Sequence, residues 1–236
     1  WLLKWVPQYI SMIVVPLLAL VPTVIIAHTV LGPIGWTIGQ WVSEVVYAGL
    51  TGDFRWLFGR FFGTLYSPLV ITGLHHMSNA IDLQLIADFG GTNLWPMIAL
   101  SNIAQGSAVL AIIFLHRGNE KEEQVSIPAA ISCYLGVTEP AMFGINIKYI
   151  YPFVAAMIGS GIAGLVATTF NVMANSIGVG GIPGFLSIQT DSMAMFIVCM
   201  AIAIVVPFLL TVLFEKKQLF APKGEVEDAP VIQTQN

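Results

Sequence analysis

Long runs of apolar residues, almost free of charged side chains, set the strongest limit on how this chain can fold. Hydrophobic residues make up 56% of the sequence and charged residues only 9%. A soluble domain carries about 25% charged residues, so this chain lacks the polar surface that water requires. We therefore expect an all-α polytopic membrane protein whose apolar surface faces lipid, and we exclude a soluble globular domain.

Six segments are candidate transmembrane helices, since a helix needs about 20 mostly apolar residues to cross a bilayer. The first contains Pro7, Pro16 and Pro22, which indicate kinks. The second is weaker because it contains Gln40 and Glu44, and it could instead lie at the membrane interface. The candidate spans are residues 6–30, 34–50, 54–74, 94–115, 149–170 and 193–214.

Two further segments, residues 75–92 and 125–147, are apolar but broken by glycine, proline and polar residues. Non-helical backbone survives at membrane depth only where protein or a watery cavity satisfies its polar groups. We interpret both segments as re-entrant hairpins. The expected fold is therefore about six transmembrane helices plus two re-entrant hairpins.

The placement of lysine and arginine predicts the orientation of these segments, because basic loops favour the cytoplasm. Segments 31–35 and 171–192 contain no basic residue and are expected outside. The first hairpin would then enter from outside and the second from the cytoplasm. The basic residues assigned to the cytoplasm are Lys4, Arg55, Arg60, Arg117, Lys121, Lys148, Lys216 and Lys217.

Glu139 is the residue that most strongly indicates function, because a carboxylate inside an apolar membrane segment is costly. Pro140 disfavours helical geometry at Glu139 and leaves nearby backbone groups free. An unwound turn of Thr138, Glu139 and Pro140 facing a cavity would offer a polar solute both acceptors and donors. The alternative is a structural carboxylate tied to backbone amides or to Lys148.

His75 and His76 follow Gly73 at the end of a candidate span. Adjacent residues diverge on a helix, so at most one of the two is expected to face a ligand. Such a pair is often structural, and its spacing matches no common metal site. The polar residues that follow and raise the chance of a functional role are Asn79, Asp82 and Gln84.

Asn102 and Gln105 lie three residues apart within a candidate span and therefore share one helix face. They could hydrogen-bond a solute or join two helices. Gly59 and Gly63 have the GxxxG spacing that usually means close helix packing. The glycine-rich segment 178–184 lacks the Gly-Lys-Ser/Thr ending of a phosphate loop, and we expect a flexible external loop near a translocation path.

Several motifs occur together in this sequence. They are Gly73-Leu-His-His-Met-Ser-Asn-Ala-Ile-Asp82, Ser101-Asn-Ile-Ala-Gln-Gly106, Leu135-Gly-Val-Thr-Glu-Pro140 with Phe143-Gly-Ile-Asn146, and Gly180-Gly-Ile-Pro-Gly184. This combination resembles the enzyme IIC domain of the glucose–sucrose branch of phosphotransferase system permeases, over residues 1 to about 214. Asp82 and segment 84–88 are more similar to trehalose-specific members than to sucrose- or β-glucoside-specific ones.

The resemblance implies a homodimer with about ten transmembrane helices and two re-entrant hairpins, the first helices being absent from this chain. It implies that a disaccharide binds between the hairpins and receives a phosphoryl group at C6 from a phosphocysteine on a IIB domain, supplied by IIA and HPr. No cofactor or metal is implied. Neither Cys133 nor Cys199 suits a phosphocysteine, so this chain alone is not expected to phosphorylate sugar.

The expected site follows from these motifs. Glu139 and His75 are the expected catalytic residues. The expected substrate-binding residues are His76, Asn79, Asp82, Asn102, Gln105, Thr138 and Asn146. The expected division of the chain is residues 1–52 as scaffold helices, 53–214 as the transport part, and 215–236 as a disordered cytoplasmic tail.

The leading hypothesis is a group translocator of the bacterial inner membrane that imports a disaccharide, with trehalose as the expected sugar. The chain begins at Trp1 without a methionine or a signal-peptide pattern, so we interpret it as part of a longer protein. The main alternative is an ion-coupled secondary sugar transporter with Glu139 as its proton or sodium site. A third alternative is a membrane anchor or sensor that binds sugar without moving it.

Overall fold

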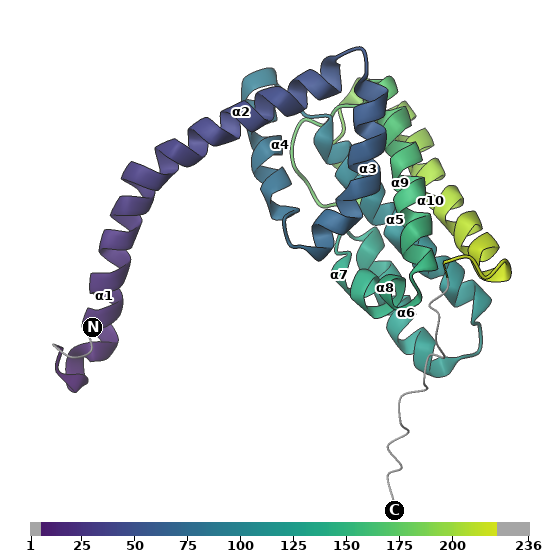
Figure 1. The fold of residues 1–236 in the computed structure, drawn as a ribbon, viewed down its shortest axis with the longest axis horizontal. Coiled ribbons are helices and arrows are strands. Elements are labelled where there is room, and N and C mark those ends of the chain that lie inside the picture. Colours follow the sequence, from purple (N-terminus) through teal and green to yellow (C-terminus); the bar gives the residue numbers. More distant parts are fainter. Residues whose placement is uncertain (1–5, 221–236) are drawn as a thin grey trace, which may run out of the picture. The chain divides into compact units, whose positions relative to one another are not determined.

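The computed structural model describes residues 6–220, and these form helices joined by turns and by one longer irregular segment, residues 170–181 (Figure 1). The β-type pairing in this part of the chain consists of isolated bridges of Ala174 with Thr92 and Ile188. The elements are α1 (Gln8–Ile26), η2 (Ala27–Leu31), α2 (Gly32–Thr51), α3 (Arg55–Ile71), α4 (His76–Phe89), α5 (Leu94–Leu115), α6 (Glu120–Tyr134), α7 (Glu139–Ala141), η3 (Met142–Asn146), α8 (Ile147–Tyr149), α9 (Tyr151–Thr169), η4 (Ile182–Ser187), η5 (Thr190–Ser192) and α10 (Met193–Lys216).

Four helical segments are long and apolar enough to cross a membrane, which confirms the predicted polytopic class. Most of the predicted spans 34–50 and 54–74 lies outside these four and folds as α2 and α3. With 17 residues and two arginines, α3 is shorter and less apolar than a full crossing requires. The four segments are Met12–Gly35, Leu94–Leu115, Tyr151–Thr169 and Thr190–Lys216.

The first of two compact units ends at Val46, within α2. Its two helices are joined by the π-helical turn η2, in which the Gly32 amide donates to the Ala27 carbonyl. Pro33 follows directly and has no amide hydrogen to continue an α-helical pattern, which explains the wider turn here. None of the window that defines the span Met12–Gly35 is buried, so its apolar side chains are free to face lipid.

The second unit begins at Tyr47 and is built around α5. Every residue of α5 from Leu94 to Val109 is buried, as expected for a helix that is apolar on all sides. The helices α3, α6, α9 and α10 pack around it. Because α5 carries Asn102 and Gln105, two predicted site residues lie in the centre of this unit.

Small residues let α3 approach α9 closely. Gly59 packs against Gly164 and Thr168, and Gly63 packs against Ser160. A methyl group at either glycine would overlap these neighbours, so the GxxxG spacing does mark a close helix contact. The order of the contacts shows that α3 and α9 are antiparallel.

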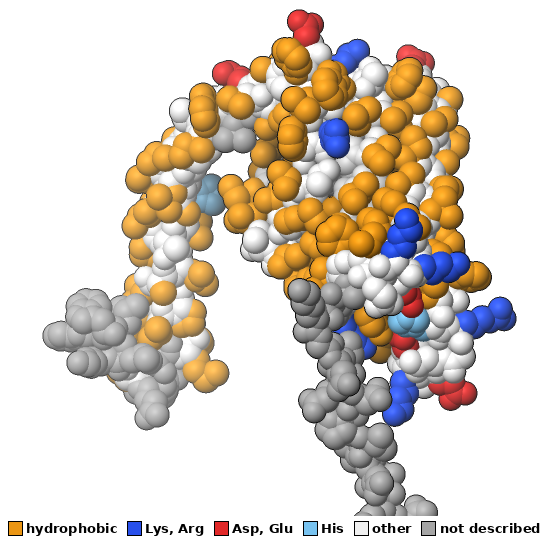
Figure 2. All heavy atoms as spheres, turned by 45° about the vertical axis from the view of Figure 1, so that its right-hand side comes forward, with side chains coloured by type: hydrophobic (Ala, Val, Ile, Leu, Met, Phe, Trp, Pro, Cys, Tyr) orange, Lys and Arg blue, Asp and Glu red, His pale blue; other side chains and the backbone are white. Residues whose placement is uncertain are grey.

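This direction of α3 contradicts one part of the predicted topology. The Arg55 end of α3 lies where α9 ends and segment 171–192 begins, while Lys148 precedes the start of α9. Arg55 therefore lies at the end of the unit opposite Lys148, and Arg60 lies beside Gly161, near the middle of α9. This arrangement does not fit the prediction that all basic residues share one side; Lys4 lies outside the described residues. Figure 2 shows basic side chains at both ends. The physical reason is that Gly59 packs against Gly164 and Gly63 against Ser160, and these close contacts fix the direction of α3 along α9.

Two helix–turn–helix arrangements enter this unit from opposite ends. In the first, α3 and α4 are joined by the turn 72–75, so the predicted hairpin segment 75–92 forms only its second arm. In the second, α6 is followed by the turn 135–138 and then by the short helices α7, η3 and α8. We call residues 72–75 the first turn and residues 135–138 the second turn.

Candidate functional site

The second turn contacts the middle of a helix that is long and apolar enough to span a membrane. The Asn102 side chain, near the centre of the span Leu94–Leu115, donates a hydrogen bond to the Gly136 carbonyl at 3.3 Å. Gly136 has φ +99°, which a side chain would disfavour, and a Cβ there would lie 2.7 Å from the Gly180 amide nitrogen. The glycine is therefore needed both for the turn and for the close approach.

Glu139 opens α7 directly after this turn. Pro140 occupies the first turn of α7, where its missing amide hydrogen costs no helical bond. Thr138 is buried just before it. The unwound backbone is thus residues 135–138, slightly earlier than the Thr138–Pro140 turn that the sequence predicted.

The first and second turns bring His75 and Glu139 together. His75 Nε2 lies 3.8 Å from Glu139 Oε1, and the two side chains are 14% and 46% exposed. The Tyr66 ring packs edge-on against the His75 ring, with centroids 6.5 Å apart. The His76 ring lies 4.0 Å from that of His75, so only His75 directly faces the carboxylate.

A buried polar network lies on the α5 side of this pair. Gln105 donates to the Ser67 hydroxyl at 2.7 Å, and Asn146 donates to the Gln105 side-chain oxygen at 2.5 Å. The Ser67 and Ser101 hydroxyls are 3.3 Å apart. Gln105 and Asn146 therefore join α3, α5 and η3 directly. For Gln105 this agrees with the predicted alternative that it joins helices. A sugar contact by Gln105 or Asn146 stays a prediction.

The π-helical turn η3 places Asn146 in this network. The Ile147 amide donates to the Met142 carbonyl, five residues back, which widens the helix at this point. Such turns occur frequently at functional sites. The side-chain oxygen of Asn146, Oδ1, is buried without a hydrogen-bond partner among the described residues, so it remains available as an acceptor.

Asp82 makes its side-chain hydrogen bond outside the His75–Glu139 pair. It is fully buried, and it accepts a hydrogen bond from the Thr92 hydroxyl at 2.6 Å. The Thr92 backbone pairs in turn with Ala174. Asp82 therefore ties α4 to segment 171–192. Asn79 is half-buried about one helical turn after His75, and a sugar contact by either residue stays a prediction.

Segment 178–184 was expected to be a flexible external loop. Gly180 and Gly181 in it are buried against the second turn, where Gly181 has φ +65° and packs on the Tyr134 carbonyl, so this part of the segment is held by packing. Its position outside the membrane stays a prediction. Sequence reasoning also missed Ser67 and Ser101. The serines gave little signal because a single hydroxyl in an apolar run commonly bonds to its own helix.

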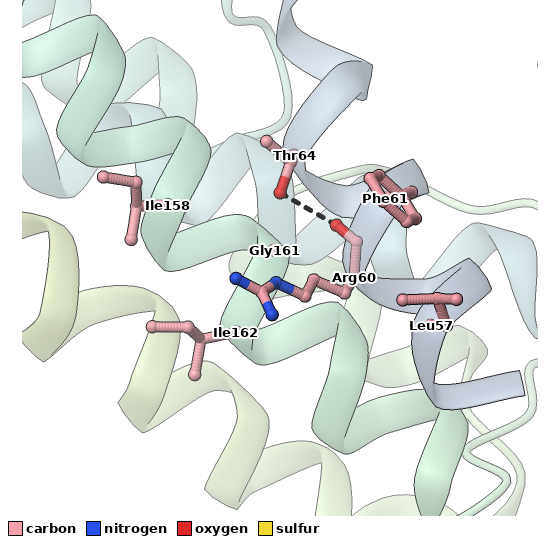
Figure 3. A pocket seen from close by; sticks show the side chains of 7 residues that line it. All are labelled: Leu57, Arg60, Phe61, Thr64, Ile158, Gly161 and Ile162. Carbon is pink, nitrogen blue, oxygen red and sulfur yellow. Dashed lines mark hydrogen bonds between the residues drawn. The ribbon is translucent and has the colours of Figure 1, made fainter. Parts of the chain in front are cut away.

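A groove of about 440 Å³ lies elsewhere, on the outer face of α3 and α9 (Figure 3). The Arg60 side chain extends across it, and its walls are mainly apolar. It contains none of the predicted site residues, so it does not serve as the candidate site. Its lining residues are Leu57, Arg60, Phe61, Thr64, Ile158, Gly161 and Ile162.

The geometry supports hydrogen bonding and proton transfer. Among residues 6–220, no group of three His, Cys, Asp or Glu side chains is arranged to hold a metal ion. A carboxylate beside an imidazole can accept a hydrogen bond from a hydroxyl group and take up its proton. The candidate site is thus the meeting point of the two turns.

Comparison with known proteins identifies similar sequences. The family model described as "Phosphotransferase system, EIIC" matches residues 1–160. The phosphotransferase system trehalose-specific EIIBC component of Escherichia coli (strain K12) is 54% identical over 206 residues, which cover 87% of this chain and 43% of that protein. The trehalose-specific EIIBC component of Bacillus subtilis (strain 168) is 46% identical over 209 residues, covering 88% and 44%.

A sucrose-specific relative is almost as similar. The sucrose-specific EIIBC component of Pasteurella multocida (strain Pm70) is 44% identical over 224 residues, covering 91% of this chain and 45% of that protein. The chain thus spans less than half the length of these relatives. No solved structure gave a significant match.

Proposed function

Because this chain belongs to the phosphotransferase system EIIC family, we propose that it is the sugar-carrying membrane part of a permease that imports a disaccharide and releases it as the 6-phosphate. The observation that carries this proposal is the 3.8 Å approach of His75 and Glu139 across two interrupted helices. An ionisable pair beside a membrane-spanning helix is costly unless it binds something polar.

Trehalose is the proposed sugar. The two trehalose-specific relatives are 54% and 46% identical to this chain, and the sucrose-specific relative is 44% identical. The second trehalose-specific relative is only slightly more similar to this chain than the sucrose-specific relative is. Support for trehalose therefore comes mainly from the relative that is 54% identical. Asp82 and segment 84–88, which resemble trehalose-specific members, point the same way.

In the proposed reaction Glu139 accepts a hydrogen bond from the C6 hydroxyl of the sugar and takes its proton. The hydroxyl oxygen attacks the phosphorus of a phosphocysteine, and the phosphorus–sulfur bond breaks to leave a thiolate. His75 orients the carboxylate. The sugar phosphate is then trapped by its charge.

The phosphocysteine is proposed to belong to a IIB domain rather than to this chain. Cys133 and Cys199 are both fully buried in the membrane part of the structure, where a partner domain cannot reach them. The proposed partners are therefore IIB, IIA and HPr, and the proposed assembly is a homodimer in the inner membrane. The proposed cytoplasmic tail lies mostly in residues 221–236, outside the described residues.

The test uses the full-length permease in membrane vesicles with labelled trehalose. We expect uptake and 6-phosphate formation to require phosphoenolpyruvate and the phosphorelay proteins. Glu139→Gln should lower the phosphorylation rate by about 100-fold or more, since it removes the proton acceptor. Glu120→Gln is the matched control, because Glu120 is exposed at the start of α6.

Two results would overturn the proposal. One is trehalose uptake that continues without phosphoenolpyruvate and collapses with a protonophore, as an ion-coupled carrier would behave. The other is a Glu139→Gln permease that phosphorylates trehalose at the rate of the Glu120→Gln control.

A further inference from the structure

A second cluster of ionisable side chains lies where α6 begins, next to the C-terminal ends of α5 and α10. His116 follows α5, and its Nδ1 is 2.7 Å from Glu122 Oε2 in the first turn of α6. Its Nε2 is 3.1 Å from Glu215 Oε1 near the end of α10. Both ring nitrogens can donate only when the imidazole is protonated, so this geometry fits an imidazolium between two carboxylates.

Two tyrosines extend the cluster across the next chain junction. The Tyr149 hydroxyl donates to Glu122 Oε1 at 2.6 Å, and the Tyr151 hydroxyl donates to Glu215 Oε2 at 3.0 Å. Each carboxylate is therefore bonded on both of its oxygens. We call these five residues, His116, Glu122, Tyr149, Tyr151 and Glu215, the His116 clamp.

The junction between the two tyrosines is strained. Ile150 has φ +63°, and a β-branched side chain rarely adopts a positive φ. Such strain persists only where the surroundings impose it, and it often marks a point of conformational change. We call residues 120–149, from α6 to α8, the arm that carries Glu139. Tyr149 ends this arm, whereas Tyr151 starts α9. The His116 clamp therefore holds the residues on both sides of Ile150, the residue about which this arm would turn.

The surroundings favour the charged form of His116. Burial by itself lowers the pKa of His116, but the hydrogen bonds to Glu122 and Glu215 and their charges outweigh it, so the pKa is raised above its ordinary value of 6.5. Burial, followed by the bond to Glu122, raises the pKa of Tyr149, which keeps that hydroxyl a donor.

The other charged groups around the clamp lie at its edge. Lys148 donates to the Tyr149 hydroxyl at 3.4 Å, and Glu123 accepts a bond from the Gly118 amide rather than from His116. The remaining charged residues on the elements packed against His116 are Arg117, Glu120, Lys121, Lys216 and Lys217.

From this geometry we propose that protonated His116 is a positioning residue, which holds the arm carrying Glu139 against α5 and α10, and that loss of its proton frees this arm to turn at Ile150. A neutral imidazole can donate to only one of the two carboxylates. Glu122 and Glu215 would then be like charges with no cation between them. This inference rests on the proposed function only in linking the arm to sugar binding.

The sign of the pH dependence follows from the direction of the shift. Because the pKa of His116 is raised when the clamp is closed, the clamp stabilises the arm most strongly below about pH 6.5. Its stabilisation is lost as the pH rises through the raised value. We therefore expect the arm to be held at mildly acidic pH and released at alkaline pH.

The experiment is amide hydrogen exchange of the sugar-free, full-length permease, corrected for the intrinsic dependence of exchange on pH. Protection of residues 120–149 should fall by about tenfold from pH 6 to pH 9, whereas protection of α5 should not change. His116→Gln should show the low protection at both pH values. His28→Gln is the matched control, because His28 is exposed and lies in the other unit.

Equal protection of residues 120–149 at both pH values in the wild-type permease would overturn the inference, and this result needs no variant. A His116→Gln permease that keeps the wild-type pH dependence would also overturn it. If His116→Gln does not fold, Glu215→Gln replaces it with the same expected loss of pH dependence. The two proposals can fail separately. If the permease shows the expected exchange behaviour but neither binds nor phosphorylates trehalose, the proposed function is rejected and this inference stands.

Discussion

At the scale of single residues, polar side chains of similar size have different roles in this molecule. Gln105 is buried between three elements and makes hydrogen bonds at both ends of its amide. Glu139, by contrast, is 46% exposed, and its Oε1 lies 3.8 Å from His75 Nε2. The first is fixed by the protein, while the second has acceptor capacity left for a ligand.

Replacing Gln105 tests its role in joining helices. Gln105→Leu keeps a side chain of similar size but removes the hydrogen bonds of the Gln105 side chain with the Ser67 hydroxyl and the Asn146 amide. Ser67 keeps its contact with Ser101, and Asn146 keeps its bond to the backbone carbonyl of residue 105. A hydrogen bond contributes about 0.5–1.5 kcal/mol, so the thermal unfolding temperature in detergent should fall. Gln124→Leu, at an exposed position on α6, is the control and should unfold near the wild-type temperature. Equal unfolding temperatures for the two variants would show that the network contributes no stability.

At the scale of elements, the turns carry the site and their glycines decide whether they can form. Gly136 combines a positive φ with backbone contact to Gly180. Gly118 also has a positive φ, +93°, but nothing lies within 4 Å of the Cβ that would be added there. This pair separates the cost of the conformation from the cost of the contact.

An alanine at each glycine provides the measurement. Gly118→Ala should lower the free energy of unfolding by about 1–3 kcal/mol through backbone strain alone. Gly136→Ala should cost clearly more, because the Gly180 backbone must also move, and it should weaken trehalose binding since the same turn precedes Glu139. Chemical denaturation in detergent and a trehalose titration would check both. A Gly136→Ala permease as stable as Gly118→Ala would contradict the close approach.

At the scale of the whole molecule, the second unit has two chemically distinct ends. One holds the start of α3 and segment 171–192, and the other holds the His116 clamp with Arg117, Lys148 and Lys216. The site lies between them, where the two turns meet. An arrangement of this kind lets each turn be attached to a different side of the membrane.

Labelling with a membrane-impermeant maleimide tests this arrangement. In the full-length permease with its other reactive cysteines replaced, Asp53→Cys and Ser176→Cys should be labelled from the same side, and Lys121→Cys from the opposite side. Cys133 and Cys199 should react slowly because both are buried. If Asp53→Cys and Lys121→Cys were labelled from one side, the topology expected from basic residues would be right and the direction of α3 in the structure would be wrong.

The sequence by itself determined the class of this protein and the position of its interruptions. Apolar runs with few charges require a membrane fold, and interrupted backbone can lie within such runs only where protein or a watery cavity satisfies its polar groups. Glu139 and His75 stood out for that reason. These conclusions depend on the cost of exposing polar groups to lipid, which each segment carries in its own composition.

Only the tertiary structure decided the direction of α3, the burial of Gly180 and Gly181, and which polar residues meet. The pairing of His75 with Glu139, and of Gln105 with Ser67 and Asn146, depends on how helices far apart in sequence pack. The same holds for His116, whose two hydrogen-bond partners come from two other elements, α6 and α10. Residue spacing fixes which side chains share a face of one helix, but contacts between helices are set by close packing of the whole unit.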